Sequence, residues 1–495
     1  MKKLTYYKDT IFYLVSLLYI TLFVYAALSK LIDFDNFQVQ IAQSPLLSAF
    51  AGPISFSIPI IELLIAVGLG IEKFRKKALL AGLSLMVMFT VYIIIIINFS
   101  PFIPCSCGGV FEKMSWNQHL IFNIIMIIIA FVAIMVKSNN NSSFKFRVST
   151  LLLSVSLSSI GMLALYFSSE QMMHTRNPFI RRFPHHPAIL SKIIDLDFNS
   201  YYLAGVGKSE VYLGNLTAPL SVTVIDSGLL HKKRYQIVTM PPRDSFFNLK
   251  LNVLEPNFYL SDGQLPMVYQ GTVNDWKAKI WTKNTAYFNA FEPISTSKAI
   301  FRAISSKDHN HVLGSFSVKD TTTLVHLQSI LGSKKEGVFS TSGDLSYNST
   351  HKKIIYTYTY KNEYIVIDPF SFRTEIRHTI DTNSHVRIKT SHNALKDETR
   401  LASPAWIVNK MARTNKDYIF VNSQIIGRFE DKNIWNKASI IDTYNINTGA
   451  YEFSFYLTNI KDIKMSDFIV TNEKIYIICG QHLAYFDLKK GFYKN

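Results

Sequence analysis

"VYIIIIINFSPFIPCSCGG", residues 91–109, joins one of the most apolar blocks of the chain to a short segment that holds two of its three cysteines. From Val91 to Ile97, every residue except Tyr92 is Val or Ile. A block of this kind, closing a run of about 20 mostly apolar residues, is typical of a helix that spans a membrane. The stretch therefore predicts a membrane span that ends at a loop containing Cys105 and Cys107.

The composition of the whole chain also favours a membrane protein. Its 495 residues leave room for two or three domains. The hydrophobic content of 48% and the positive mean hydropathy exceed those of an ordinary soluble protein. Three cysteines are too few for a disulfide-stapled secreted scaffold. The formal charge of +17 does not indicate nucleic acid, because the basic residues are spread along the chain without zinc-finger spacing or an RNA-recognition motif.

Five apolar runs precede residue 170, and each approaches the roughly 20 residues that a bilayer crossing takes. The first run has no convincing small-residue cleavage site and four more follow it, so we expect a membrane helix rather than a signal peptide. The five predicted spans are Ile11 to Leu28, Leu47 to Ile71, Ala78 to Phe99, Leu120 to Val136 and Val148 to Phe167.

Basic residues gather on one side of these predicted spans. They precede the first span and fill the turns after the second and the fourth: Lys2, Lys3, Lys8, Lys73, Arg75, Lys76, Lys77, Lys137, Lys145 and Arg147. The alternate loops hold Lys30 and Lys113, which are offset by Asp33, Asp35 and Glu112. The positive-inside rule therefore predicts a cytoplasmic N-terminus in a bacterial inner membrane. The Cys105/Cys107 loop and everything after the fifth span are then expected in the periplasm.

The periplasmic location gives the two cysteines a possible redox role. Exposed thiols in this compartment can be oxidised, whereas cytosolic thiols stay reduced. Gly108 and Gly109 permit the sharp turn that a disulfide between Cys105 and Cys107 requires, and so small a ring should be strained and readily exchanged. A protonated His119 nearby would lower a thiol pKa. The alternative, two small residues in a turn, stays open.

Four stretches of the chain carry a family resemblance: "FVYAALSKLIDFDNF" (23–37), "IPIIELLIAVGL" (58–69), "PCSCGG" (104–109) and "WNQHLIFN" (116–123). On these stretches, residues 8–138 resemble the MauE/DoxX group of small four-helix membrane proteins, in particular the methylamine-utilisation MauE branch. The resemblance implies a redox-associated membrane protein that in some cases supports disulfide formation in a periplasmic partner. Two features depart from the pattern: Ser106 and Gly108 stand where the commoner form has Gly and an aromatic residue, and this chain adds a fifth span and a large domain.

Glu62 lies inside the second predicted span. A carboxylate at such a position is costly, so it should face the bundle interior with a partner or in neutral form. Lys30 and Asn98 of neighbouring helices are the candidate partners, and a proton-transfer or membrane-quinone contact is the functional interpretation. A purely structural hydrogen-bonded role stays open.

The pattern changes to short alternating strands after residue 195, as in "KKIIYTYTY" (352–360) and "NEYIVIDPF" (362–370). A degenerate strand–turn–strand repeat, seen at 364–376, 439–453 and 483–493, predicts a β-propeller of six or seven blades, with a pair of β-sandwiches as the competing fold. Four parts are therefore expected: a four-helix membrane domain, a cytoplasmic turn with the fifth span, a basic linker and a periplasmic β-domain, with bounds 1–138, 139–170, 171–194 and 195–495.

The predicted β-domain carries little catalytic signal. We find no Ser-His-Asp signature, nucleophile elbow or metal-ligand cluster, and Cys479 within a strand is expected to be an inert buried thiol. Binding or scaffolding is therefore the expected role of this domain, and no metal is expected.

Two functions remain from the sequence. The first is a possible membrane thiol–disulfide oxidoreductase, in which Cys105 and Cys107 exchange disulfides or electrons in support of a periplasmic thiol protein, with His119, Glu62, Gly108, Gly109 and Lys30 assisting. The second is a non-enzymatic, membrane-anchored propeller that acts as an adaptor or a sensor. A transporter is less favoured, because the spans lack a broken-helix repeat.

Overall fold

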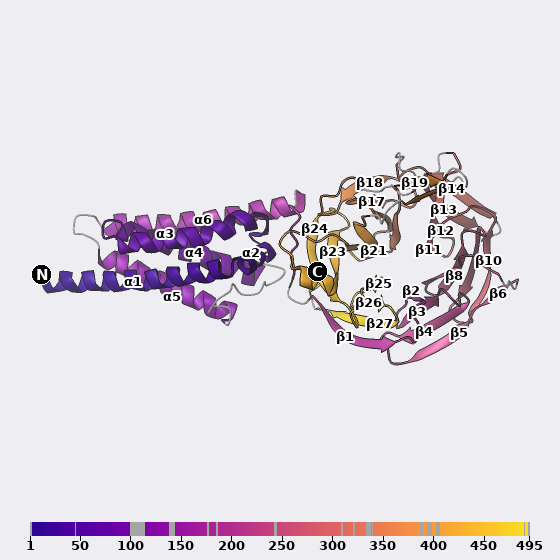
Figure 1. Cartoon of the computed structure of the whole chain (residues 1–495), viewed down its shortest axis with the longest axis horizontal. Helices are drawn as coiled ribbons and strands as arrows, with labels where there is room; N and C mark the ends of the chain where they lie inside the picture. Colours follow the sequence, from indigo (N-terminus) through magenta and orange to yellow (C-terminus); the bar gives the residue numbers. More distant parts are fainter. Residues whose placement is uncertain are drawn as a thin grey trace. The chain divides into compact units, whose positions relative to one another are not determined.

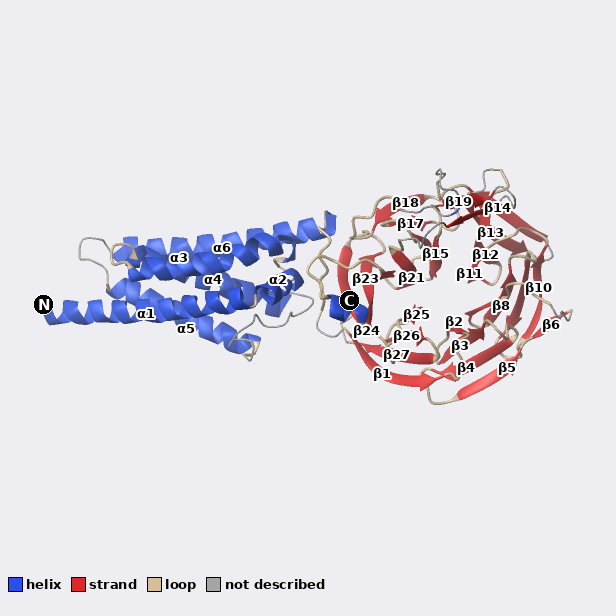
Figure 2. Ribbon diagram, viewed as in Figure 1, coloured by secondary structure: helices blue, strands red, loops and turns tan. Residues whose placement is uncertain are grey.

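The computed structural model divides the chain into two compact units, a helical one and a β one (Figures 1 and 2). The first comprises Met1–His185 with Gly427–Glu430, and the second comprises His186–Ile426 with Asp431–Asn495. The structure describes residues 2–44, 46–99, 114–137, 144–175, 178–184, 187–241, 245–307, 310–319, 322–332, 338, 340–386, 390–393, 398–401, 406–489 and 491–493.

The helical unit contains the five predicted spans. Five helices are long and apolar enough to cross a membrane: Tyr7–Ile32, Ser48–Gly70, Arg75–Asn98, Trp116–Val136 and Val148–Ser169. The full elements are α1 (Lys2–Ile32), α2 (Phe34–Gln43), the 3₁₀ turn η1 (Ser48–Phe50), α3 (Ala51–Gly70), α4 (Arg75–Phe99), α5 (Trp116–Val136) and α6 (Phe144–Thr175).

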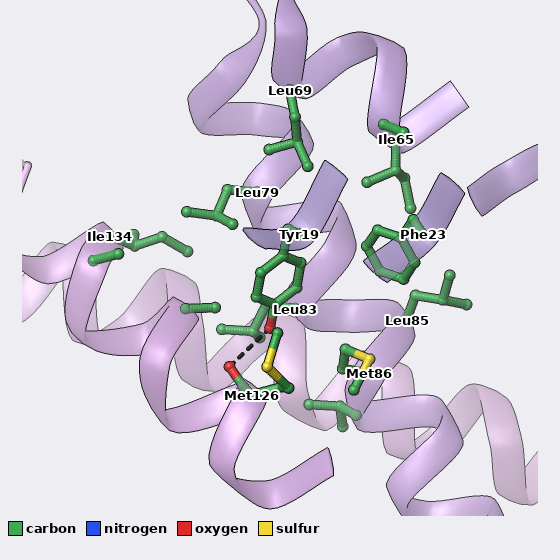
Figure 3. Packing of buried hydrophobic residues seen from close by; sticks show 14 of the residues in the cluster. Tyr19, Phe23, Ile65, Leu69, Leu79, Leu83, Leu85, Met86, Met126 and Ile134 are labelled. Carbon is green, nitrogen blue, oxygen red and sulfur yellow. Dashed lines mark hydrogen bonds between the residues drawn. The ribbon is translucent and has the colours of Figure 1, made fainter. Parts of the chain in front are cut away.

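The centre of the helical unit is an apolar cluster built mainly from α1, α3, α4 and α5. Figure 3 shows Tyr19 inside it, where the phenol donates a hydrogen bond of 2.8 Å to the carbonyl of Met126. Gly82 of α4 lies against the rings of Phe23 and Tyr19, and a Cβ there would come within 3.0 Å of Phe23. The small residue therefore lets α4 approach α1 closely, as is common where membrane helices pack.

The fifth span is packed into this unit through polar contacts. Ser84 of α4 and Ser154 of α6 lie 2.6 Å apart through their hydroxyls, and the amide of Ala49 donates to the hydroxyl of Ser169 over 3.3 Å. Such hydrogen bonds stabilise helix pairs in an apolar environment, where water does not compete for the groups. The fifth span is thus packed against the other helices of the unit.

The β unit is a six-bladed propeller, which confirms the predicted fold class. Each blade is an antiparallel sheet, and consecutive innermost strands contact one another around the axis. The first blade contains β2 (Tyr201–Val206), β3 (Glu210–Asn215), β4 (Ser221–Asp226) and β5 (Lys232–Gln236). The second blade contains β7 (Lys250–Leu254), β8 (Asn257–Asp262), β9 (Met267–Thr272) and β10 (Lys277–Lys283), with β6 (Val238–Met240) added parallel to β10. The third blade contains β11 (Ala290–Ser295), β12 (Lys298–Ile304), β13 (His311–Lys319) and β14 (Thr322–Gln328).

The second half of the ring follows the same plan. The fourth blade contains β15 (Gly343–Asn348), β16 (Lys353–Tyr358), β17 (Glu363–Ile367) and β18 (Thr374–His378). The fifth blade contains β21 (Asn409–Asn415), β22 (Tyr418–Ser423), β23 (Ala438–Asn445) and β24 (Tyr451–Thr458). The sixth blade contains β25 (Asp467–Val470), β26 (Lys474–Cys479) and β27 (His482–Leu488), together with β1 (Ala188–Asp195). The hairpin β19 (Thr390–Asn393) and β20 (Glu398–Leu401) and the short helix α7 (Lys432–Asn436) lie between strands of the ring.

Strand sequences reflect their place in a blade. Inner positions such as β22 are buried along their whole length, because each blade is covered on both faces by its neighbours. The outermost strands are largely exposed, as in β5. A strand that is buried on both faces reads as a nearly continuous apolar run, and an outer strand shows little apolar pattern at all.

The first strand of the β unit closes its last blade. β1 pairs antiparallel with β27, from Ala188 opposite Leu488 to Asp195 opposite His482. The sequence analysis places most of β1 in the linker, because this outer strand is mainly exposed and lacks the alternating pattern of a half-buried strand. Pairing the first strand of the unit with its last hairpin closes the ring between the sixth and the first blade.

We expect Leu196→Ala to destabilise the propeller by about 2–5 kcal/mol, the usual range for a fully buried leucine. Leu196 follows β1 directly, has 0% exposure and packs between the last and the first blade, while its amide donates to the carbonyl of Gln481. Denaturant unfolding of the full chain measures the effect. Leu190→Ala, within β1 but at a side chain 38% exposed, is the control and should change stability far less. Equal losses for both variants would contradict the closing role of this segment.

Candidate functional site

The helical unit holds a buried ion pair between two spans. Lys30, in the last turn of α1, places its Nζ 2.7 and 3.0 Å from the two carboxylate oxygens of Glu62 in α3. The Glu62 side chain is 0% exposed and that of Lys30 is 16% exposed. Of the two partners considered from the sequence, the structure pairs Glu62 with Lys30. The amide of Asn98 instead donates to the carbonyl of Ile94.

Further contacts fix the position of the lysine. Its Nζ lies 3.3 Å from the carbonyl of Ala26 and 5.8 Å from the ring centroid of Phe37 in α2. The carboxylate, a backbone carbonyl and an aromatic face thus replace the water that the ammonium loses. Because a single buried charge in a membrane is costly, the pair defines which faces of α1 and α3 meet.

His119 lies near this pair. It belongs to the first turn of α5, close enough to Lys30 for the ammonium charge to act on the imidazole. The start of α5 is set by a capping box: the amide of Gln118 donates to the Ser115 hydroxyl over 3.3 Å, and the Ser115 amide donates to the Gln118 side chain over 2.8 Å. The structure therefore pairs two of the predicted site residues, Lys30 and Glu62, and places His119 within electrostatic reach of Lys30.

Other polar side chains join the helices at the same end of the bundle. The side-chain amide of Gln38 donates to the hydroxyl of Ser55 over 3.2 Å. The phenol of Tyr92 donates to the hydroxyl of Ser44 over 2.9 Å. The rings of Tyr92 and Trp116 lie 6.5 Å apart. The sequence analysis missed these residues. Their only signal was the presence of polar groups within or beside apolar runs, which does not reveal their partners.

Cys105, Cys107, Gly108 and Gly109 lie outside the described residues. They belong to the stretch of chain between Phe99, the last residue of α4, and Trp116, the first residue of α5. Their predicted redox role therefore stays a prediction.

A second charged cluster lies on four consecutive innermost strands of the propeller. Arg413 of β21 contacts Asp344 of β15 and Asp467 of β25, each over 2.8 Å, and donates over 2.9 Å to the carbonyl of Phe468. Burial by itself lowers the pKa of the guanidinium, but the two carboxylates more than offset this and raise it. The arginine thus ties the fourth, fifth and sixth blades together at the axis.

Glu292 of β11 extends this axial cluster to the third blade. Burial raises the pKa of its carboxyl to about 8, against the opposing effect of Arg413 and with a further rise from Asp344. At neutral pH it is therefore mostly protonated and adds little charge. Within the described ranges, no group of three or more His, Cys, Asp or Glu side chains is arranged to hold a metal ion. The cluster's chemistry is that of a structural tie between blades.

Cys479 lies in β26, where it is fully buried and has a free thiol. Burial raises the pKa of this thiol to about 11, so the nucleophilic thiolate is scarce at neutral pH. The structure thus agrees with the expectation that this cysteine is buried and inert.

A known protein family matches most of the helical unit. Residues 8–136 match the family model described as Methylamine utilisation protein MauE. The match covers α1 to α5, including Lys30, Glu62 and His119, and confirms the resemblance over this region. α6 and the whole propeller lie outside the MauE match, which spans about a quarter of the chain.

Solved structures share only a distant likeness with the chain, and no curated protein matches it. A protein of unknown function from Bacteroides thetaiotaomicron has a TM-score of 0.39 at 12% identity, covering 61% of this chain and 73% of the other. Regucalcin, a calcium-binding protein from Agrobacterium tumefaciens, has a TM-score of 0.34 at 7% identity, covering 60% and 93%. A chain of the nidogen/laminin complex has 0.33 at 8%, covering 52% and 79%. At these scores the likenesses carry no argument, and the propeller assignment rests on the strand pairing.

We expect a strong energetic coupling between Lys30 and Glu62. Lys30→Met or Glu62→Gln alone leaves one buried charge without its partner and should destabilise the bundle by about 3–5 kcal/mol, whereas the double variant should lose much less than the sum. Unfolding in mixed detergent micelles measures the three values. The exposed pair Lys137–Asp9, with side chains 37% and 52% exposed, is the control, and its coupling should stay below about 1 kcal/mol. Additive losses at the buried pair would refute the coupling.

Glu292 should make the propeller less stable at alkaline pH. The pKa of this carboxyl is 4.5 in the unfolded chain and about 8 in the folded one, so the folded state holds the proton more tightly. The contribution to stability is full below pH 4.5 and is lost as the pH rises toward about 8. Glu292→Gln should therefore flatten the fall in unfolding free energy between pH 4.5 and about pH 8, by a few kcal/mol at most. Glu375→Gln, at a side chain 67% exposed, should leave that fall unchanged.

Proposed function

We propose that this protein exchanges disulfides with a partner at the outer surface of a bacterial inner membrane, with Cys105 and Cys107 as the exchanging pair. One observation supports this most: Lys30, Glu62 and His119 cluster where α5 begins, and the chain segment that carries both cysteines leads directly into α5. The MauE match over the same region adds to the support. The basic turns between the spans favour a periplasmic position for this end of the bundle.

The exchange follows ordinary thiol chemistry. A thiolate of a periplasmic client attacks the Cys105–Cys107 disulfide and forms a mixed disulfide, releasing one thiolate of the pair. The second client thiolate then attacks the client sulfur of the mixed disulfide. The client thereby gains a disulfide, and the cysteine pair is left as a dithiol. Reoxidation of the pair needs an acceptor for two electrons and two protons, and a membrane quinone is an acceptor of that class. The reverse direction would reduce the client.

The buried pair suits this chemistry through its charges. A cation beside a thiol favours the thiolate, and Lys30 carries an ammonium. Glu62 compensates the ammonium, so the site holds no uncompensated buried charge while the cysteines are not engaged. A carboxylate and an imidazole together also offer a route for the protons that accompany oxidation of the dithiol.

A second candidate function rests on the propeller. A closed six-bladed ring makes up most of the chain, and we propose binding or scaffolding as its role. In that interpretation the five helices serve as an anchor, and the propeller recruits a partner as an adaptor or a sensor. The two functions are compatible if the propeller presents a client to the thiol pair.

Single serine substitutions separate these functions. Cys105→Ser or Cys107→Ser should abolish exchange. Offered an oxidised client, the surviving thiolate attacks the client disulfide, releases one client thiolate and stays trapped as a mixed disulfide, because the second cysteine of the pair, which would resolve it, is missing. Non-reducing gel analysis of membranes, with mass spectrometry of the adduct, detects the trapped species. Cys479→Ser is the control and should leave exchange intact, since that thiol is buried.

The accessibility of the two cysteines to a membrane-impermeant reagent tests the predicted orientation of the protein in the membrane. A membrane-impermeant maleimide should label Cys105 and Cys107 in intact spheroplasts after reduction, because the positive-inside pattern predicts that they lie outside. Wild-type client oxidation by a Cys105→Ser/Cys107→Ser double variant would rule out the thiol mechanism and leave the propeller as the functional part.

A further inference from the structure

Four blades of the propeller expose an aromatic side chain at the same structural position. The third residue before the innermost strand is Phe198 before β2, Phe247 before β7, Tyr287 before β11 and Trp406 before β21. Their exposed fractions are 60%, 75%, 71% and 55%. We call these four residues the aromatic rim.

The blade topology places the aromatic rim on one face of the ring. Each blade has four antiparallel ring strands, so the chain returns to the same edge before each new innermost strand begins. In the first blade, for example, Tyr201 at the start of β2 lies opposite Asn215, and Ser221 lies opposite Gln236. The innermost strands surround the axis, as Figure 2 shows for β2, β11, β15, β21 and β25. The rim residues therefore encircle one mouth of the axis.

The exposure of these rings is not a by-product of loose loops. Buried apolar neighbours fix the same segments: Leu196 at 0%, Leu249 at 5%, Phe288 at 9% and Val408 at 0% exposure. The chain thus turns one side chain inward to the core and holds the aromatic ring outward. Large apolar groups gathered at one exposed face commonly mark a contact surface.

Basic side chains accompany the rim. Among the described loop residues at this edge, five exposed lysines outnumber three exposed acidic residues: Lys307, Lys432, Lys437, Lys461 and Lys464 against Asp197, Asp431 and Asp462. Aromatic rings together with lysines are the composition of protein segments at the interface of a bilayer, where rings enter the headgroup zone and ammonium groups meet lipid phosphates.

The chain also keeps the propeller near a bilayer. α6 ends at Thr175 and β1 begins at Ala188, so only residues 176–187 lie between a membrane helix and the ring. Fully extended, such a tether spans at most about 40 Å. Contact with the lipid surface is therefore an intramolecular event with a high effective concentration, and a modest apolar contact suffices to populate it.

We propose that the aromatic rim binds the headgroup region of the lipid bilayer, so that this face of the propeller is a membrane-binding surface. The inference does not depend on the thiol mechanism, because no rim residue belongs to the helical unit. It gives the propeller a preferred face toward lipid in addition to its covalent tether.

A matched pair of tryptophan substitutions tests the proposal in the full chain. Phe247→Trp places a probe on the rim, and Phe370→Trp places one at the opposite edge, between β17 and β18, where the phenylalanine is 69% exposed. Both variants are reconstituted in nanodiscs of anionic phospholipid, with and without bromine on the upper acyl chain. The added emission of each variant over wild type isolates the new residue from the five native tryptophans.

We expect brominated lipid to reduce the added emission of Phe247→Trp by roughly two-fold and to leave that of Phe370→Trp unchanged, because interfacial rings lie within reach of the upper acyl chain. The emission lost on Trp406→Phe should show the same quenching as Phe247→Trp. Equal, unquenched emission from both inserted probes overturns the proposal. Protection of residues 245–249 from hydrogen exchange only after a partner protein is added also overturns it, in favour of a polypeptide-binding face.

Discussion

The ladder between β1 and β27 is the constraint on which the whole propeller depends. It joins the first strand of the β unit to its last hairpin, with Asp195 opposite His482, although nearly the entire unit lies between them in sequence. Without this pairing the sixth blade would lose its outermost strand, and the start of the unit would no longer hold the last hairpin beside the first blade. Leu196, Tyr476 and Leu483 share the core that this closure creates. The stability of every blade is thus linked to a strand that is itself mostly exposed.

Buried charge organises both units by the same rule. A charge removed from water needs a partner, and the partner comes from a different segment of the chain. Glu62 and Lys30 join α3 to α1, while Arg413 joins its own blade to Asp344 and Asp467 of the blades on either side. Such pairs add less to net stability than apolar packing does, but they penalise every arrangement that separates them. They therefore help to select one helix order and one blade register.

The end of the helical unit that holds Lys30, Glu62 and His119 contains ionisable side chains that a membrane anchor does not need. A membrane anchor needs only apolar helices, whereas here α1, α3 and α5 contribute an amine, a carboxylate and an imidazole to one place. The helices are held by the apolar cluster around Tyr19, which leaves this end free to carry polar groups. The MauE match includes these residues, so the site and the scaffold that positions it belong to the same module.

The sequence by itself determined the five spans, the switch to strands and the repeat, because apolar run length and strand periodicity are local properties that one segment carries alone. It also marked Glu62 as a residue in need of a partner, since the cost of a carboxylate in an apolar helix does not depend on the fold. Tertiary structure decided that the partner is Lys30 and not Asn98, because that choice depends on how helices pack. It likewise decided that β1 closes the ring and that Phe198, Phe247, Tyr287 and Trp406 share one face. Those facts join residues distant in sequence, and only a folded chain brings such residues together.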